Sequence, residues 1–145
     1  MQLNIFNKEL VHEVEPTFDI SFEDIHNGYL KIFDKYELEE INVIFVEQEY
    51  IKKLNSKYRN IDAATDVLSF NISDNPNLAE IYLCPQYILN SFQGDQFEEE
   101  ILRLIIHGTL HILGYEHAHS LNEGPNEEMF ILQEELLLKY KKICF

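Results

Sequence analysis

Three histidines lie close together in this chain, at a spacing that suits metal binding. They are His107, His111 and His117, in the segment IIHGTLHILGYEH that begins at Ile105. On a helix His107 and His111 stand one turn apart, so their imidazole rings lie side by side on one face and can share an ion. Gly114 can take the left-handed conformation that ends a helix, which lets the chain turn back and bring His117 to the same ion. Three neutral imidazoles suit Zn²⁺ and leave a fourth position for water, as in catalytic zinc sites.

The histidine pair alone does not establish a metal site. Two histidines on an apolar helix are often core residues bonded to the backbone, and the third histidine with the intervening glycine is what favours a metal. His119 is an alternative third ligand, ranked below His117. The segment also carries a polar stripe on an otherwise apolar helix, made of Glu100, Arg103, His107 and His111. This pattern predicts a buried helix whose stripe faces a cleft.

Composition and charge restrict the class of protein. The chain has 145 residues and no apolar run of membrane-spanning length, and its N-terminus lacks a signal-peptide pattern. We therefore expect one cytoplasmic domain over residues 1–145, without a membrane partner. The net charge of -15 is unusual for a protein that binds nucleic acid. Cations nevertheless cluster in one predicted helix, at Lys52, Lys53, Lys57 and Arg59, and predict a local positive patch. Cys84 and Cys144 are expected to be free thiols.

Strand and helix patterns alternate along the chain. Strands are expected at residues 2–6, 41–46, 65–72 and 80–84, with residues 41–46 covered on both faces of a sheet. Helices are expected at residues 21–35, 49–58, 97–114 and 127–142, and another is expected to begin near Pro85. This order predicts an α+β fold in which helices pack over a small sheet.

The same histidine spacing occurs in metzincin proteases, which carry a glutamate directly after the first histidine as general base. This chain has Gly108 at that position, which disfavours peptide hydrolysis. A glycine inside a helix costs about 1 kcal/mol relative to alanine. Gly108 therefore predicts that another backbone or side chain approaches the helix closely there.

Two motifs of the chain resemble those of the YbeY endoribonucleases, bacterial factors of rRNA maturation. HGTLHILGYEH begins at His107 and resembles the family pattern HGxLHLxGYDH, while LNSKYRNIDAATDVLSF begins at Leu54 and resembles LNxxYRxxxxPTDVLSF. The resemblance covers about residues 41–136. It implies a zincin-like α+β domain, a small mixed sheet packed against helices with a central metal-binding helix. It also implies that His107, His111 and His117 bind one Zn²⁺ and that Arg59 is the catalytic arginine.

The chain departs from the family pattern at three places. Ala64 replaces a proline, and Ala79, Glu80 and Ile81 stand at the family's GDI, while Glu116 replaces an aspartate. The resemblance assigns Glu80 and Glu116 as catalytic carboxylates, which act as general base or orient a ligand histidine. For Glu116 a solvated turn residue remains the alternative.

The resemblance and the residue chemistry predict the same activity. Zinc lowers the pKa of bound water towards about 7, and the planar guanidinium of Arg59 can donate two hydrogen bonds to a phosphate. The alternative for Arg59 is an exposed cation at a helix end, paired with a carboxylate. The local track of Lys52, Lys53 and Lys57 is expected to bind RNA.

The predicted function is a metal-dependent, single-strand-specific endoribonuclease. By resemblance it acts in 3'-end maturation of small-subunit rRNA and in ribosome quality control, with ribosomal RNA, the small subunit and its proteins as partners. One alternative is a non-catalytic assembly factor held together by zinc, and a metzincin-like zinc protease is a weaker one. The sequence leaves open the identity of the metal beyond a zinc preference and the oligomeric state.

Overall fold

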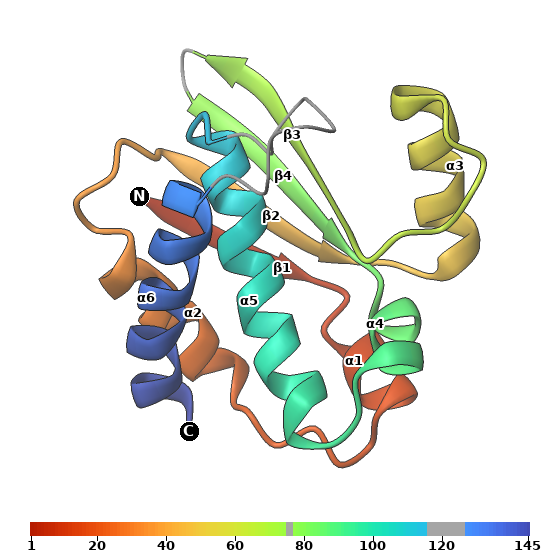
Figure 1. Cartoon of the computed structure of the whole chain (residues 1–145), viewed down its shortest axis with the longest axis horizontal. Helices are drawn as coiled ribbons and strands as arrows, with labels where there is room; N and C mark the ends of the chain where they lie inside the picture. Colours follow the sequence, from red (N-terminus) through yellow and green to blue (C-terminus); the bar gives the residue numbers. More distant parts are fainter. Residues whose placement is uncertain (75–76, 116–126) are drawn as a thin grey trace.

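The computed structural model of the chain describes residues 1–74, 77–115 and 127–145. Its four strands form one mixed sheet in the order β1-β2-β4-β3 (Figure 1). Strands β1 (Gln2–Phe6), β2 (Glu40–Phe45) and β4 (Asn77–Leu83) are parallel, and β3 (Val67–Asp74) pairs antiparallel with β4 at the edge. The predicted α+β arrangement with a small mixed sheet is confirmed.

Six helices are present in the described ranges: α1 (Glu9–Val14), α2 (Phe22–Ile32), α3 (Gln48–Arg59), α4 (Pro85–Ser91), α5 (Asp95–Ile112) and α6 (Glu127–Cys144). Ser21 caps α2 as predicted, because its Oγ accepts hydrogen bonds from the backbone N–H groups of Glu23 and Asp24. The sequence analysis did not find α1, which is short and has no side-chain cap. No helix in the described ranges is long and apolar enough to cross a bilayer.

Helices α2, α5 and α6 pack together on one face of the sheet and enclose the main core (Figure 1). Alternate residues of the two central strands are buried on this face: Ile41, Val43, Phe45, Ala79, Ile81 and Leu83. A buried hydrogen bond of 2.9 Å joins the Tyr29 hydroxyl of α2 to Thr109 Oγ1 of α5. The core therefore fixes α5 against both the sheet and its neighbouring helices.

The opposite face of the sheet is only partly covered. Ile51 of α3 packs there in a small second cluster with Leu68 and Cys84. Asn42 and Ile44 of β2 are half-buried on this face. The prediction that residues 41–46 are covered on both faces is therefore wrong, because α3 packs near one end of the sheet and no helix in the described ranges covers the rest.

Helix α5 approaches the sheet most closely at Gly108. A Cβ atom at this position would lie 2.9 Å from Cγ2 of Ile81 on β4. That separation is shorter than two carbon atoms tolerate, so only glycine allows the helix this close to the strand. The close approach predicted from the sequence is confirmed, and it brings His107 and His111, on either side of Gly108 in the sequence, close to the sheet.

We predict that Gly108→Ala destabilises the protein by about 1 kcal/mol. Overpacking costs about 1–3 kcal/mol, and the better helix propensity of alanine returns about 1 kcal/mol. Urea unfolding followed by circular dichroism measures the change. A double-mutant cycle with Ile81→Ala should show a favourable coupling, since the smaller side chain accommodates the new methyl group. A Gly108→Ala protein more stable than wild type would contradict the close approach.

Candidate functional site

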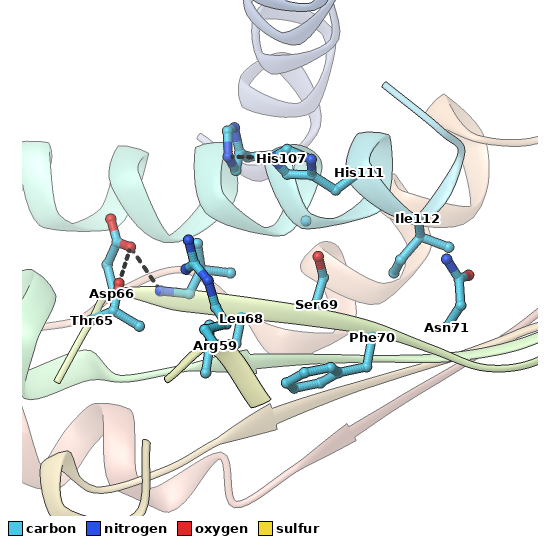
Figure 2. Close-up of a pocket in the computed structure, with 12 residues that line it drawn as sticks. Arg59, Thr65, Asp66, Leu68, Ser69, Phe70, Asn71, His107, His111 and Ile112 are labelled. Carbon is cyan, nitrogen blue, oxygen red and sulfur yellow. Dashed lines mark hydrogen bonds between the residues drawn. The ribbon is translucent and has the colours of Figure 1, made fainter. Parts of the chain in front are cut away.

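A cavity of about 400 Å³ lies between helix α5 and the edge strand β3 (Figure 2). It is lined by seven polar side chains, which are Arg59, Thr65, Asp66, Ser69, Asn71, His107 and His111. Figure 2 shows the two histidines on α5 above β3, with Ser69 pointing towards the helix and Phe70 pointing away from it. Sequence segments far apart in the chain, including both motifs of the sequence analysis, therefore meet at one cavity.

The two histidines of α5 face each other through one ring nitrogen each. His107 Nε2 and His111 Nε2 are 3.1 Å apart, and the ring centroids are 4.6 Å apart. His107 Nδ1 lies 2.7 Å from Oε1 of Gln133 on α6. Because an amide oxygen can only accept, Nδ1 carries the hydrogen, and in the neutral ring Nε2 then holds the lone pair. His107 therefore presents an unprotonated Nε2 towards His111.

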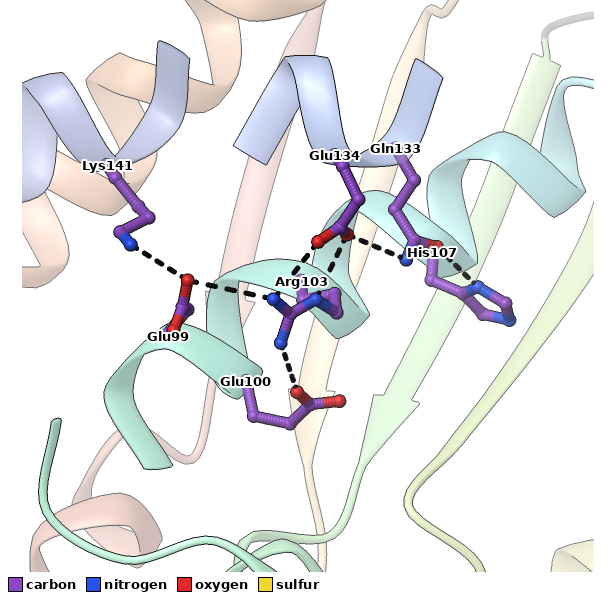
Figure 3. Close-up of polar contacts among 7 residues, drawn as sticks. All are labelled: Glu99, Glu100, Arg103, His107, Gln133, Glu134 and Lys141. Atoms are coloured by element: carbon purple, nitrogen blue, oxygen red, sulfur yellow. Dashed lines mark hydrogen bonds and ion pairs between the residues drawn. The ribbon is translucent and has the colours of Figure 1, made fainter. Parts of the chain in front are cut away.

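A chain of polar contacts holds Gln133 in this orientation (Figure 3). Gln133 Nε2 donates to Glu134 Oε2 over 3.2 Å, so its amide oxygen is directed to His107. Arg103 donates to Glu134 through Nε and Nη2, at 3.1 and 3.2 Å. Its Nη1 donates to Glu100 over 2.6 Å. The chain thus links α5 to α6 and fixes which nitrogen of His107 is protonated.

The charges of this network follow from its contacts. Burial opposes ionisation of Glu134, but hydrogen bonds from Arg103 and Gln133 outweigh it and hold the pKa of Glu134 below its ordinary value. Burial also disfavours the charge on Arg103, yet hydrogen bonds to Glu134 and Glu100 raise the pKa of the guanidinium. Arg103 and Glu134 are therefore both charged at neutral pH, and their ion pair persists there.

Gln133 was not predicted as a site residue, although a local signal was present in the sequence. Met129, Gln133, Leu136 and Tyr140 are all buried and recur at helical spacing, so Gln133 is a polar residue on the inner face of α6. Such a residue needs a buried partner. The signal identifies Gln133 as paired, but it does not identify His107 as the partner.

Arg59 is the last residue of α3, and its side chain is exposed where it lines the cavity. Asn60 follows with φ of 58°, in the left-handed conformation, and turns the chain into the next loop. Asn55 Nδ2 holds that loop by donating to the Ala63 carbonyl over 2.9 Å. Arg59 forms no ion pair with a carboxylate of the described chain, unlike the helix-end alternative considered from the sequence.

The loop before β3 is shaped by Asp66. Asp66 Oδ1 accepts hydrogen bonds from the Val67 backbone N–H at 2.8 Å and from the Thr65 hydroxyl at 3.3 Å. The same carboxylate lines the cavity. Asp66 therefore contributes a carboxylate to the cavity as well as local structure.

Glu80 does not reach the histidines. Its neighbour Ile81 lies beneath Gly108 and pairs with Ser69, so both of these residues face α5. Side chains alternate along a strand, and Glu80 therefore points to the opposite face. There its Oε1 accepts a 2.9 Å hydrogen bond from the Tyr82 hydroxyl. The predicted role of Glu80 as base or histidine-orienting group at this site is wrong, because the sheet separates the two.

The other predicted site residues are either outside the described chain or away from the cavity. Glu116, His117 and His119 lie outside the described residues. Lys53 and Lys57 are exposed and Lys52 is half-buried on α3, and none of the three lines the cavity. The structure thus brings Arg59, His107 and His111 to one cavity and leaves the lysines on a neighbouring surface.

The histidine pair fits two ligands of a zinc ion. Tetrahedral zinc with nitrogen bonds of about 2.0–2.1 Å holds two ligand nitrogens about 3.3 Å apart. The two Nε2 atoms, 3.1 Å apart, need little movement to reach that geometry. In residues 1–74, 77–115 and 127–145, no three His, Cys, Asp or Glu side chains gather as a metal site. A third ligand from the described chain is therefore not in place.

The sequence and structure of this chain are similar to those of known proteins. The family model described as Endoribonuclease YbeY matches residues 4–141. Endoribonuclease YbeY of Acholeplasma laidlawii is 38% identical over 96% of this chain and 96% of its own length. That of Thermosipho melanesiensis is 36% identical over 83% of this chain and 91% of its own. A solution structure from Thermotoga maritima, 28% identical, superposes with a TM-score of 0.64 over 97% of this chain and 89% of that one. The chain belongs to the YbeY family.

Proposed function

We propose that this protein is a metal-dependent endoribonuclease that cleaves single-stranded RNA. The observation that carries the proposal is the convergence of His107 Nε2 and His111 Nε2 in a cavity that Arg59 also lines. The names of the relatives, Endoribonuclease YbeY, support RNA as the substrate. Within the proposal, the substrate is small-subunit ribosomal RNA, cleaved at its 3' end during maturation, with a further role in ribosome quality control.

His107, His111 and, as predicted from the sequence, His117 would hold the metal ion. When bound, a zinc ion supplies a water of lowered pKa and an electrophile for a phosphoryl oxygen. Gln133 keeps the hydrogen of His107 on Nδ1, so that Nε2 carries the lone pair that would coordinate the metal. Glu116 remains the proposed base, since Glu80 lies on the other face of the sheet.

Arg59 would bind the scissile phosphate. Its guanidinium can donate two parallel hydrogen bonds to the phosphate oxygens and stays charged throughout the reaction. Arg59 makes no ion pair within the described chain, so substrate binding breaks none with those residues. The left-handed Asn60 and the bond from Asn55 to Ala63 fix the backbone that follows Arg59, and so the point from which its side chain extends.

Packing disfavours one of the two alternative functions, and the other requires an activity measurement. A metzincin-like protease needs a glutamate directly after the first histidine, and a side chain at Gly108 would collide with Ile81. A protease function is therefore disfavoured by packing as well as by sequence. A non-catalytic assembly factor would use the same zinc ligands without the chemistry, and only an activity measurement separates it from the nuclease.

We predict that Arg59→Ala and His111→Ala each lower the cleavage rate of a small-subunit rRNA precursor fragment by about 100-fold or more, since the first removes the guanidinium that binds the phosphate and the second removes a metal ligand. Gel analysis of metal-loaded protein measures the rate. Lys139→Ala, an exposed cation on α6, is prepared in the same way and should cleave like wild type. Equal activity in all four proteins would indicate a contaminating nuclease and contradict the proposal, while inactive wild type holding one zinc would favour the assembly factor.

We further predict that Gln133→Leu weakens zinc binding by about 10–100-fold, because His107 loses the acceptor that fixes its protonation. Competition with a chromophoric chelator measures the affinity. Glu134→Gln retains the amide of Gln133 and should have a smaller effect. Thermal unfolding of the metal-free proteins shows whether both variants are folded. Unchanged zinc affinity in folded Gln133→Leu would show that Gln133 does not prepare the ligand.

A further inference from the structure

Four aromatic rings form a row on the face of the sheet opposite α5. The ring centroids of Tyr50 and Tyr82 are 6.2 Å apart, those of Tyr82 and Phe70 are 5.9 Å apart, and those of Phe70 and Tyr58 are 5.1 Å apart. Tyr50 and Tyr58 come from the two ends of α3 and are 49% and 57% exposed. We call these four residues the aromatic row. Tyr82 and Phe70 between them are half-buried, so the two exposed rings at the ends of the row present the surface on which other flat groups can stack.

The aromatic row begins at the edge of the proposed active site. Phe70 is among the residues that line the cavity, and its ring points away from α5 into the row (Figure 2). Tyr58 directly precedes Arg59, and both lie in the last turn of α3. Because β3 is the edge strand and Arg59 is next to Tyr58, an RNA chain bound at Arg59 can pass this edge of the sheet to reach the row.

The charge of α3 suits a polyanion. The helix carries four cations and one carboxylate, Glu49, a net charge of +3 in a chain of net charge -15. Among the described helices it is the one with net positive charge. Tyr50, Lys53 and Lys57 lie at i, i+3 and i+7, on one side of α3. Lys57 Nζ lies 5.1 Å from the centroid of the Tyr58 ring, so these cations flank the row.

We propose that the aromatic row binds the nucleotides of single-stranded RNA that flank the scissile phosphate, an inference that rests on the proposed function. Bases stack on Tyr50 and Tyr58, because base–aromatic stacking tolerates any sequence, and the phosphates follow Lys53 and Lys57. Glu80 supports this orientation. Its Oε1 holds Tyr82 in place by accepting from the Tyr82 hydroxyl, and its carboxylate repels phosphates, which leaves them to Lys53 and Lys57.

The test compares RNA of two lengths. Labelled 2'-O-methyl oligouridines of three and ten nucleotides are titrated with protein, and fluorescence anisotropy gives the dissociation constants. The variant pair Tyr50→Leu and Tyr58→Leu removes both rings but keeps apolar bulk, and Tyr50→Phe with Tyr58→Phe keeps the rings. Tyr87→Leu, on α4 and also exposed, is the matched control.

The wild type should bind the ten-nucleotide RNA more tightly than the three-nucleotide RNA. The double leucine variant should lose about tenfold of that affinity per ring, while the double phenylalanine variant and Tyr87→Leu keep it. Lys53→Gln with Lys57→Gln should reduce the salt dependence, lowering the slope of log affinity against log salt by about 1.4.

A double leucine variant that binds the longer RNA like wild type would overturn the proposal, and this is also the result expected if the row binds a protein. A wild type that shows no gain in affinity with length would overturn it as well. Cleavage is followed separately on unmodified RNA. If the wild type binds through the row but cuts nothing, the proposed function fails and the aromatic row stands. If the wild type cuts RNA while the double leucine variant retains full affinity, the proposed function stands and the proposal that the aromatic row binds RNA is wrong.

Discussion

The contact between Gly108 and Ile81 is the constraint on which the site depends. It lets α5 lie against β4 at a distance that no side chain larger than hydrogen permits. His107 and His111 flank this contact on the helix, and Ser69 of β3 pairs with Ile81 directly below it. The close approach therefore sets the width of the cavity in which histidines from a helix, an arginine from another helix and a loop carboxylate meet. It also excludes the glutamate that a protease of this histidine spacing requires.

Position alone does not prepare the histidines, because a neutral imidazole has two tautomers. The link from Arg103 through Glu134 and Gln133 to His107 selects one of them. The ion pair within this link is partly buried and remains charged at neutral pH, since hydrogen bonds hold the pKa of Glu134 down. The same link ties α6 to α5, so the helix packing and the chemistry of the ring nitrogen are determined by one set of contacts.

Local periodicity predicted which side chains share a face of one helix. It did not predict which side chains of different elements contact each other. The helical spacing of His107 and His111 was sufficient to place both rings on one side, and Gly108 correctly indicated close packing. Glu80 was predicted at the histidine site because the sequence does not show which face of its strand packs against α5. The pairing of Ile81 with Ser69 puts Glu80 on the opposite face. Gln133 was missed because its partner lies on another helix. The face of β2 that carries Asn42 was predicted to be covered but is only half-buried, because its coverage depends on where α3 packs. Whether His117 completes the site is still a prediction from the sequence.

The most direct test of the account is to locate a metal between the two histidines. A crystal grown with zinc and measured on both sides of the zinc absorption edge gives an anomalous difference map that identifies the element and its position. The account predicts a peak about 2.0–2.1 Å from His107 Nε2 and from His111 Nε2, with His107 Nδ1 still bonded to Gln133. A map with no peak between these atoms, or with zinc bound through His107 Nδ1, would contradict it.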